Sequence, residues 1–394
     1  MNGLYNGERG TSHRARIPNY SHREPDIACG PINCGFSLNM RKGIFQATIS
    51  NNENHKFMQQ IYAHRFFNRA IINKFTLSRN ALSRPAAFSR TISLNPGSVP
   101  SIDLVQVGET KVENIVDRAV TFRCFETKVL EDFKYQPTPS KVCVAHTNPP
   151  VSMNLAVDQE SVEYLHITTV GRTESEVKKE MQDVINSQDT LLVKHTSVWE
   201  RDWAKFEISV TGNQNLNRII HASIFYLVSN LPSDTTNQAK EPFYGLAPGG
   251  LGKGGVLYEA YQGHSFWDTE MWMHPPMLLL NPQWSQDILS YRYMVRKAAE
   301  DNARNTHYKG YRFPWESAFT GREATPDCCP EVVEYQHHII SDIAFAFRSH
   351  LAATHDVEWF KSVGCDIAWN TAKFWESRVK YNATTKFYDI RSEH

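Results

Sequence analysis

The chain has no surplus of charge of either sign and no long apolar run. Its 394 residues include 42 basic side chains (Lys and Arg) and 42 acidic ones (Asp and Glu). A chain without a basic surplus offers little attraction to nucleic acid or to an anionic membrane surface. No stretch approaches the ~20 consecutive apolar residues of a membrane helix, and the first residues lack the layout of a signal peptide. We therefore expect no nucleic-acid or membrane partner, and favour a neutral or small ligand.

Cysteine is scarce and irregularly placed. The seven cysteines are an odd number, they are widely scattered, and none forms a Cys-x-x-Cys pair. This pattern favours neither a disulfide framework nor a zinc site. We accordingly predict reduced thiols and a cytoplasmic protein, with no metal ion or other cofactor.

The residues that are present predict a large folded protein with two kinds of secondary structure. Hydrophobic residues make up 41% of the chain, and the length suggests about two domains of roughly 100 to 200 residues each. Runs of β-branched and aromatic residues predict a mostly antiparallel β domain, at residues 111–129, 161–170 and 206–212.

Helical periodicity begins near residue 175. Residues 175–202 repeat apolar side chains at helical spacing, and similar stripes follow beyond Asn213. Ser285 is a candidate N-cap for one of the later helices. The predicted order is a partial β domain (1–174), a linker with a helical segment (175–212) and a helical domain (213–394).

Two dipeptides pair a tryptophan with an acid. Asp268 could accept two sugar hydroxyls while Trp267 covers the apolar face of a pyranose ring, and Trp315 with Glu316 repeats this pattern. Two simpler interpretations stay open. Asp268 would be a helix N-cap among core tryptophans, and Glu316 would only pair with Arg312 or Arg322. Glu270 is interpreted as an ordinary carboxylate in the first turn of a helix.

Two further segments are weaker candidates for a ligand site. Residues 245–255 contain six glycines but lack the Lys-Ser/Thr ending of a phosphate loop, so a nucleotide site is disfavoured and a flexible connection stays possible. Glu334 and His337 have the spacing of neighbours on one helix face. Because two ligands without a third do not make a metal site, we favour a hydrogen-bonded pocket wall.

Three segments together carry a family resemblance. They read HSFWDTEMWM from His264, SYRYMVRKAAEDNARNTHYKGYRFPWESA from Ser290, and EVVEYQHHIISDIAFAF from Glu331. In combination they closely resemble glycoside hydrolase family 65. Further matching segments begin at Asn2, Gln59 and Tyr244, so the resemblance covers nearly the whole chain.

The resemblance implies an N-terminal β-sandwich domain, a helical linker and an incomplete (α/α)6 barrel. It implies that Trp267 and Asp268 bind the glucose being released, and that Trp315 and Glu316 line the same pocket. The implied reaction is the inverting release of glucose from glucosyl-α1,2-galactosyl-hydroxylysine of collagen-type glycopeptides, so the expected partner is a small carbohydrate or a glycopeptide.

The family's general acid and base are expected beyond the segment that matches residues 386–391. The resemblance therefore assigns no catalytic residue to this chain, and it predicts a fragment that is truncated at both ends and inactive alone. Two alternatives stay open: a disaccharide phosphorylase or trehalase of the same family, and a non-catalytic sugar-binding fragment.

Overall fold

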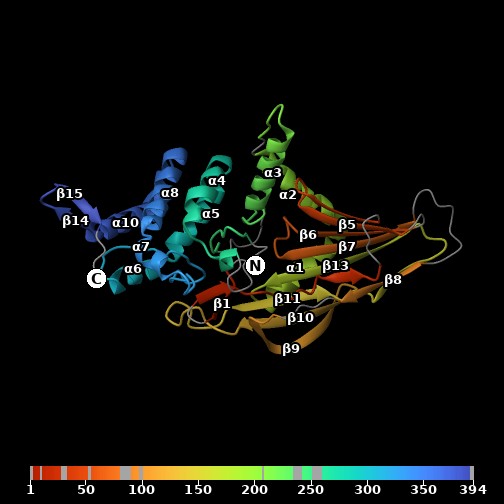
Figure 1. Cartoon of the computed structure of the whole chain (residues 1–394). Helices are drawn as coiled ribbons and strands as arrows, with labels where there is room; N and C mark the ends of the chain where they lie inside the picture. Colours follow the sequence, from red (N-terminus) through yellow and green to blue (C-terminus); the bar gives the residue numbers. More distant parts are fainter. Residues whose placement is uncertain are drawn as a thin grey trace.

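The computed structural model describes residues 3–8, 11–27, 33–51, 55–79, 90–96, 101–205, 208–233, 242–250 and 260–390. A large antiparallel sheet fills one side of the molecule and the later helices fill the other (Figure 1). The predicted change from strands to helices along the chain is confirmed.

The large sheet has eight strands in the order β4-β5-β6-β7-β13-β11-β10-β9, and every neighbouring pair is antiparallel. The strands are β4 (Cys34–Asn39), β5 (Ile44–Asn51), β6 (His55–Ala63), β7 (Ala70–Arg79), β9 (Leu104–Ile115), β10 (Arg118–Thr127), β11 (Lys141–Thr147) and β13 (Ser161–Gly171). β9, β10 and β13 fall where β-branched and aromatic runs predict strands. Residues 208–212 form no strand, which corrects that prediction, and residues 206–207 lie outside the described residues.

The two faces of the sheet are covered by different layers. Because successive side chains of a strand point to opposite faces, Ile72 and Phe75 of β7 join different cores. On the face of Phe75 the sheet packs against a three-stranded sheet of β3 (Arg23–Pro25), β8 (Arg90–Pro96) and β12 (Ser152–Leu155). On the face of Ile72 it packs against the apolar stripe of α1 (Glu174–Asn186), which includes Val177 and Met181.

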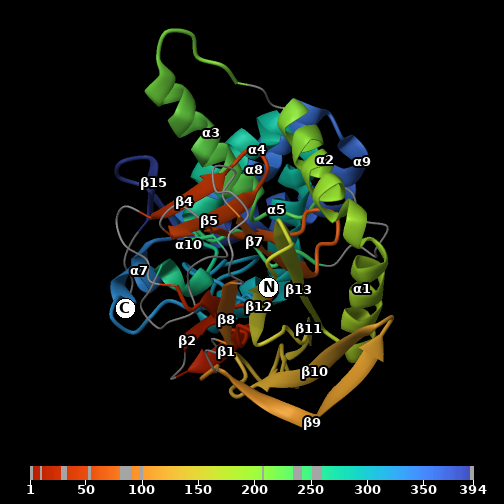
Figure 2. The same cartoon turned by 90° about the vertical axis from the view of Figure 1, so that its right-hand side faces the viewer.

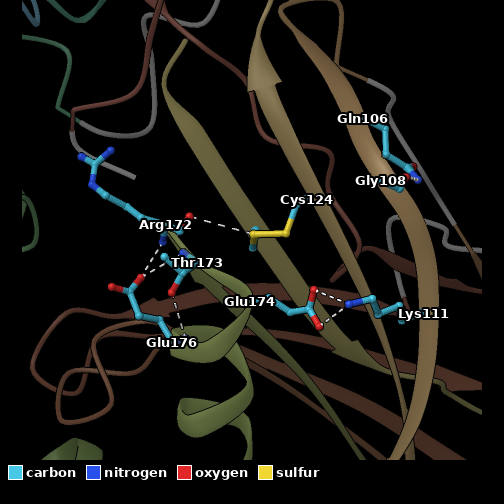
Figure 3. Close-up of a disulfide and its surroundings, with 9 residues drawn as sticks. Gln106, Gly108, Lys111, Cys124, Arg172, Thr173, Glu174 and Glu176 are labelled. Carbon is cyan, nitrogen blue, oxygen red and sulfur yellow. Dashed lines mark hydrogen bonds and ion pairs between the residues drawn. A yellow bond between two sulfur atoms is a disulfide. The ribbon is translucent and has the colours of Figure 1, made fainter. Parts of the chain in front are cut away.

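Helix α1 begins directly after β13, a central strand of the large sheet, and packs on the face of that sheet (Figure 3). The Thr173 hydroxyl accepts from the Glu176 main-chain N–H, and the Glu176 carboxylate accepts from the N–H groups of Thr173 and Arg172 at 3.2 and 2.7 Å. This capping box satisfies donors that the first helical turn would otherwise leave unpaired. Figure 2 shows α1 and α2 (Leu191–Ala204) following one another along one side of the sheet.

A disulfide joins Cys124 of β10 to Cys143 of β11 (Figure 3). The two residues lie directly opposite each other in the strand pairing, and Cys34 is disulfide-bonded as well. The prediction of reduced thiols is therefore wrong at these positions. The prediction failed because the spacing of cysteines in the sequence does not reveal strand register. The register of β10 and β11 brings together two cysteines that are 19 residues apart in the sequence. Because disulfides are rare in the reducing cytosol, cysteine usage no longer supports a cytoplasmic location.

The second half of the described chain consists mainly of helices packed on two apolar cores. They are α3 (Gln214–Val228), η2 (Ala260–Gly263), η3 (Thr269–Met273), α4 (His274–Leu280), α5 (Pro282–Met294), α6 (Arg296–Asn305), α7 (Pro330–Tyr335), α8 (His338–Thr354), α9 (Val357–Trp359), η4 (Phe360–Gly364) and α10 (Cys365–Arg378). A hairpin of β14 (Val379–Asn382) and β15 (Phe387–Ile390) follows. Among the described residues, no helix combines the length and the apolar character that crossing a bilayer requires.

Two local predictions in this half are corrected. Ser285 lies inside α5, whose N-cap is Asn281, with its side chain accepting from the Gln283 N–H at 3.2 Å. Ser285 instead contacts His274 and His350, each at 2.7 Å. Glu334 and His337 do not share a helix, because α7 ends at Tyr335 and α8 begins at His338.

A buried arginine joins the sheet to the helices. Arg65 follows β6, and its guanidinium donates to the Asp202 carboxylate of α2 at 3.1 Å and to the carbonyl of Leu231 at 2.8 Å. Its main-chain N–H donates to Nδ1 of His195, whose Nε2 lies 2.7 Å from the carbonyl of Lys42. One side chain therefore fixes α2 and the end of the α3 segment against the sheet.

Six buried histidines have lowered pKa values that keep them neutral. Burial lowers the pKa of His64 to about 3 and, at the other five positions, lowers the pKa to about 4 (His146, His166, His195, His274 and His337), against an ordinary value of 6.5. The hydrogen bonds agree at His64, because its Nδ1 accepts from the N–H groups of Phe66 and Phe67. A ring nitrogen that accepts cannot carry a proton.

We predict that the free energy of unfolding falls as the pH drops from about 6.5 towards about 4. In this window the unfolded chain binds protons at these histidines and the folded chain does not, so acid favours the unfolded state. Each histidine contributes a slope of at most about 1.4 kcal/mol per pH unit. Urea midpoints measured across this range check the prediction, and a midpoint that does not move between about pH 7 and about pH 5 would contradict it.

Candidate functional site

Three rings from distant parts of the sequence meet at one place. The His338 imidazole, at the start of α8, lies edge-on to the indoles of Trp267 and Trp315, with ring centroids 5.3 and 5.4 Å apart. Both tryptophans are partly exposed and His338 is exposed. We call Trp267, Trp315 and His338 the aromatic cluster. The structure thus brings together the tryptophans of the two Trp-acid dipeptides.

Asp268 lies at the N-cap position of η3 but does not cap it, because its side chain makes no cap hydrogen bond. Its Oδ2 is buried and has no hydrogen-bond partner within the described part of the chain. Burial raises the pKa of this carboxyl above its ordinary value. The N-cap interpretation is therefore wrong. A buried acceptor without a partner is costly, and a sugar hydroxyl could supply the missing donor.

His338 is positioned by a carboxylate that the sequence analysis missed. Its Nδ1 lies 2.6 Å from Oδ2 of Asp342, four residues later on α8. Burial raises the pKa of Asp342, and the hydrogen bond from His338 opposes this effect. The i, i+4 spacing of the two residues was the signal that could have revealed the pair.

Glu316 is buried and pairs with neither Arg312 nor Arg322. Its Oε2 lies 2.7 Å from Nδ1 of His264, whose Nε2 lies 2.6 Å from the carbonyl of Ser12. Arg312 donates instead to His337 and Val333, and Arg322 pairs with Asp132. The predicted pairing of Glu316 with either arginine is wrong.

The segments that carry the two dipeptides are paired with each other. The N–H of Ser265 donates to the carbonyl of Ser317 and the N–H of Ser317 to that of Ser265, both at 2.9 Å. The Glu323 carboxylate accepts from the N–H groups of Trp315 and Glu316 at 2.8 and 3.2 Å. These bonds fix the position of both dipeptides relative to one another.

A buried ion pair contacts both of these segments. Glu270 and Arg292 form a two-bond pair at 2.8 and 3.0 Å, and neither side chain is exposed. Arg292 also donates to the Ser317 hydroxyl at 3.0 Å and to the carbonyl of Phe266 at 3.4 Å. Glu270 thus lies in a first turn as predicted, but it is a buried structural partner and not a solvated carboxylate.

The glycine-rich loop packs against the first dipeptide segment at its described end. Gly245 has a φ of +87°, and a Cβ there would lie 2.0 Å from the Ser265 hydroxyl, so only glycine fits. The Thr269 hydroxyl donates to the carbonyl of Leu246 at 2.7 Å. Residues 251–255 of the predicted loop lie outside the described residues.

His337 is a buried, hydrogen-bonded residue, and its place in a pocket wall stays a prediction. It is buried, and Nε2 accepts from Arg312 at 3.0 Å. Burial and the charges of Arg312 and Arg378 lower its pKa to about 4. Within the described ranges, no group of three or more His, Cys, Asp or Glu side chains is placed to hold a metal ion.

The β domain contributes directly to the loops of the site. The Glu131 carboxylate, after β10, accepts from the N–H groups of Phe319 and Thr320 at 3.0 and 2.7 Å, from the Thr320 hydroxyl at 2.5 Å, and from the Ser12 hydroxyl at 2.7 Å. In the hairpin of β1 (Tyr5–Glu8) and β2 (Thr11–Arg14), the Tyr5 hydroxyl donates to the carbonyl of Gly263 at 2.7 Å. No sequence motif pointed to these contacts.

Comparison with known proteins relates part of this chain to a known enzyme family. Residues 237–392 match the sequence model of the glycosyl hydrolase family 65 central catalytic domain. The chain is 30% identical to the protein-glucosylgalactosylhydroxylysine glucosidase of Danio rerio, over 99% of the chain and 58% of that protein. It is also 36% identical to a kojibiose hydrolase of Flavobacterium johnsoniae, over 53% of the chain and 28% of that protein.

A solved structure described as "Putative kojibiose phosphorylase from human microbiome" has the same fold over nearly the whole chain. The TM-score is 0.71 at 16% sequence identity, and the match covers 98% of this chain and 55% of that one. The chain therefore spans little more than half the length of this structure and of the Danio rerio relative.

We predict that Glu131→Gln destabilises the protein by about 1.5 to 3 kcal/mol, the usual range for a hydrogen bond to a charged group. The amide puts a donor where N–H and O–H groups now point, so at least one of the four contacts is lost. Denaturant unfolding followed by tryptophan fluorescence measures the effect. Glu109→Gln, at an exposed position of β9, is the control, and equal midpoints for the two variants would refute the positioning role.

Proposed function

We propose that this chain is part of an inverting glycosidase that releases glucose from glucosyl-α1,2-galactosyl-hydroxylysine of collagen-type glycopeptides. In this proposal residues 1–174 form a β-sandwich domain, residues 175–212 a linker, and residues 213–394 the N-terminal part of an (α/α)6 barrel. The observation that carries the proposal is the unpartnered Asp268 oxygen beside the aromatic cluster.

The proposed roles follow from the chemistry of the side chains. Asp268 accepts hydroxyl hydrogens of the terminal glucose, and Trp267 covers the apolar face of its ring. Trp315 closes the same pocket, while Glu316, paired with His264, holds the wall behind it. In an inverting enzyme a general acid protonates the glycosidic oxygen and a general base activates water on the opposite face of the sugar. We assign neither of these two roles to a residue of this chain.

The extent of the matches favours the hydroxylysine-linked substrate. The Danio rerio glucosidase matches over 99% of this chain, whereas the kojibiose hydrolase matches over 53%. A phosphorylase is the alternative, because the similar solved structure carries that name and shares the fold. The two reactions differ in the nucleophile, which is water in one and inorganic phosphate in the other.

The test uses the chain extended at His394 by the C-terminal segment of the Danio rerio relative. We predict that this protein releases free glucose from glucosylgalactosylhydroxylysine in buffer without phosphate. Glucose 1-phosphate formed only when phosphate is added would instead make it a phosphorylase. Release from kojibiose but not from the hydroxylysine glycoside would overturn the proposed substrate.

In the same protein, we predict that Asp268→Asn lowers the apparent affinity for substrate or the rate by about 10- to 100-fold, because one charged hydrogen-bond acceptor is lost. Steady-state kinetics give the change, and an unaltered unfolding midpoint shows that the fold is retained. Asp158→Asn, at an exposed position of the β domain, is the matched control. Full activity of Asp268→Asn would remove Asp268 from the site.

A further inference from the structure

The loop before α7 carries two adjacent cysteines, Cys328 and Cys329. Both are free thiols; Cys328 is exposed and Cys329 is partly exposed. Their sulfur atoms lie 2.7 Å apart. In the sequence this is the one place where two cysteines follow each other. The pair is therefore in mutual contact and open to a reagent in solution.

Along the sequence, the two cysteines lie between Trp315 and His338 of the aromatic cluster. Cys329 is the N-cap residue of α7, and its N–H donates to the carbonyl of Pro326 at 3.2 Å. Upstream, Glu323 of the same loop holds the main chain of Trp315, and downstream α7 leads to His338. A bond between the two sulfur atoms would therefore alter the segment of chain that connects Trp315 to His338.

A bond between Cys328 and Cys329 would differ from the Cys124–Cys143 disulfide in its exposure to solvent. Cys328 is exposed and Cys329 is partly exposed, whereas Cys143 is 1% exposed within the core. Thiol–disulfide exchange requires that the attacking thiolate reach a sulfur atom, so an exposed disulfide is reduced more readily than a buried one.

We propose that Cys328 and Cys329 form a reversible redox modification site, at which the two thiols close to a vicinal disulfide by exchange with a low-molecular-weight disulfide such as oxidised glutathione. The thiolate of one cysteine attacks a sulfur of the oxidised glutathione and releases one glutathione. The neighbouring thiolate attacks the protein sulfur of the mixed disulfide and releases the second. The protein loses two protons and two electrons, and the glutathione disulfide takes them up to become two thiols.

Cys365 provides an internal control. It is free and exposed at the first residue of α10, and its two sequence neighbours, Gly364 and Asp366, are not cysteines. Exchange at Cys365 therefore stops at the mixed disulfide. The two sites differ in product although the reagent is the same.

The experiment treats the whole chain with oxidised glutathione, blocks the remaining thiols, and maps the peptides by mass spectrometry. We expect the Cys328–Cys329 peptide to lose two hydrogens, to carry no glutathione and to resist alkylation, while the Cys365 peptide carries the adduct. In Cys328→Ser and in Cys329→Ser, the remaining cysteine should carry glutathione as Cys365 does. A series of reduced-to-oxidised glutathione ratios should reopen the pair while Cys124–Cys143 stays closed.

Two results would overturn the proposal. One is a glutathione adduct that persists on Cys328 or Cys329 in the unsubstituted chain, since the neighbouring thiol would then have failed to displace it. The other is a pair that stays reduced under conditions in which Cys365 is fully modified. Because the readout is covalent, neither result depends on glycosidase activity or on the glucose site.

Discussion

Hydrogen bonds that cross from the β domain to the loops of the helical half determine the geometry of the candidate site. Buried main-chain groups must find partners, and those of Phe319, Thr320 and Gly263 find them in Glu131 and Tyr5. The Ser12 carbonyl likewise contacts His264. Each of these partners precedes the residue that it contacts by more than a hundred residues. The site therefore cannot be described as a property of the helices alone.

Arg292 hydrogen-bonds to both segments that carry the Trp-acid dipeptides, at Phe266 and at Ser317. A buried ion pair offsets the cost of desolvation only when its geometry is good and its remaining donors are satisfied. Arg292 meets both conditions, since it makes two bonds to Glu270 and further bonds to Ser317 and Phe266. The planar guanidinium suits this task better than an ammonium group, because its donors point in several fixed directions. Arg292 therefore holds the Ser317 and Phe266 segments to the same guanidinium.

Local patterns in the sequence were sufficient to predict most of the elements. The apolar stripes of α8 and α10 and the β-branched run of β13 depend only on neighbours within one element, so they are visible in a single sequence. Interactions that depend on strand register or on packing between distant segments were not visible. The disulfide at Cys124, the partner of Glu316 and the contacts of Glu131 all belong to this second class.

The two Trp-acid dipeptides look alike in sequence but differ in what their carboxylates can do. His264 bridges the Ser12 carbonyl oxygen and Oε2 of Glu316, so this oxygen of Glu316 already has a partner. Asp268 has no such partner among the described residues, and burial raises its pKa. Oδ2 of Asp268 therefore remains an acceptor for a ligand, whereas Oε2 of Glu316 helps to anchor Trp315 against the β domain.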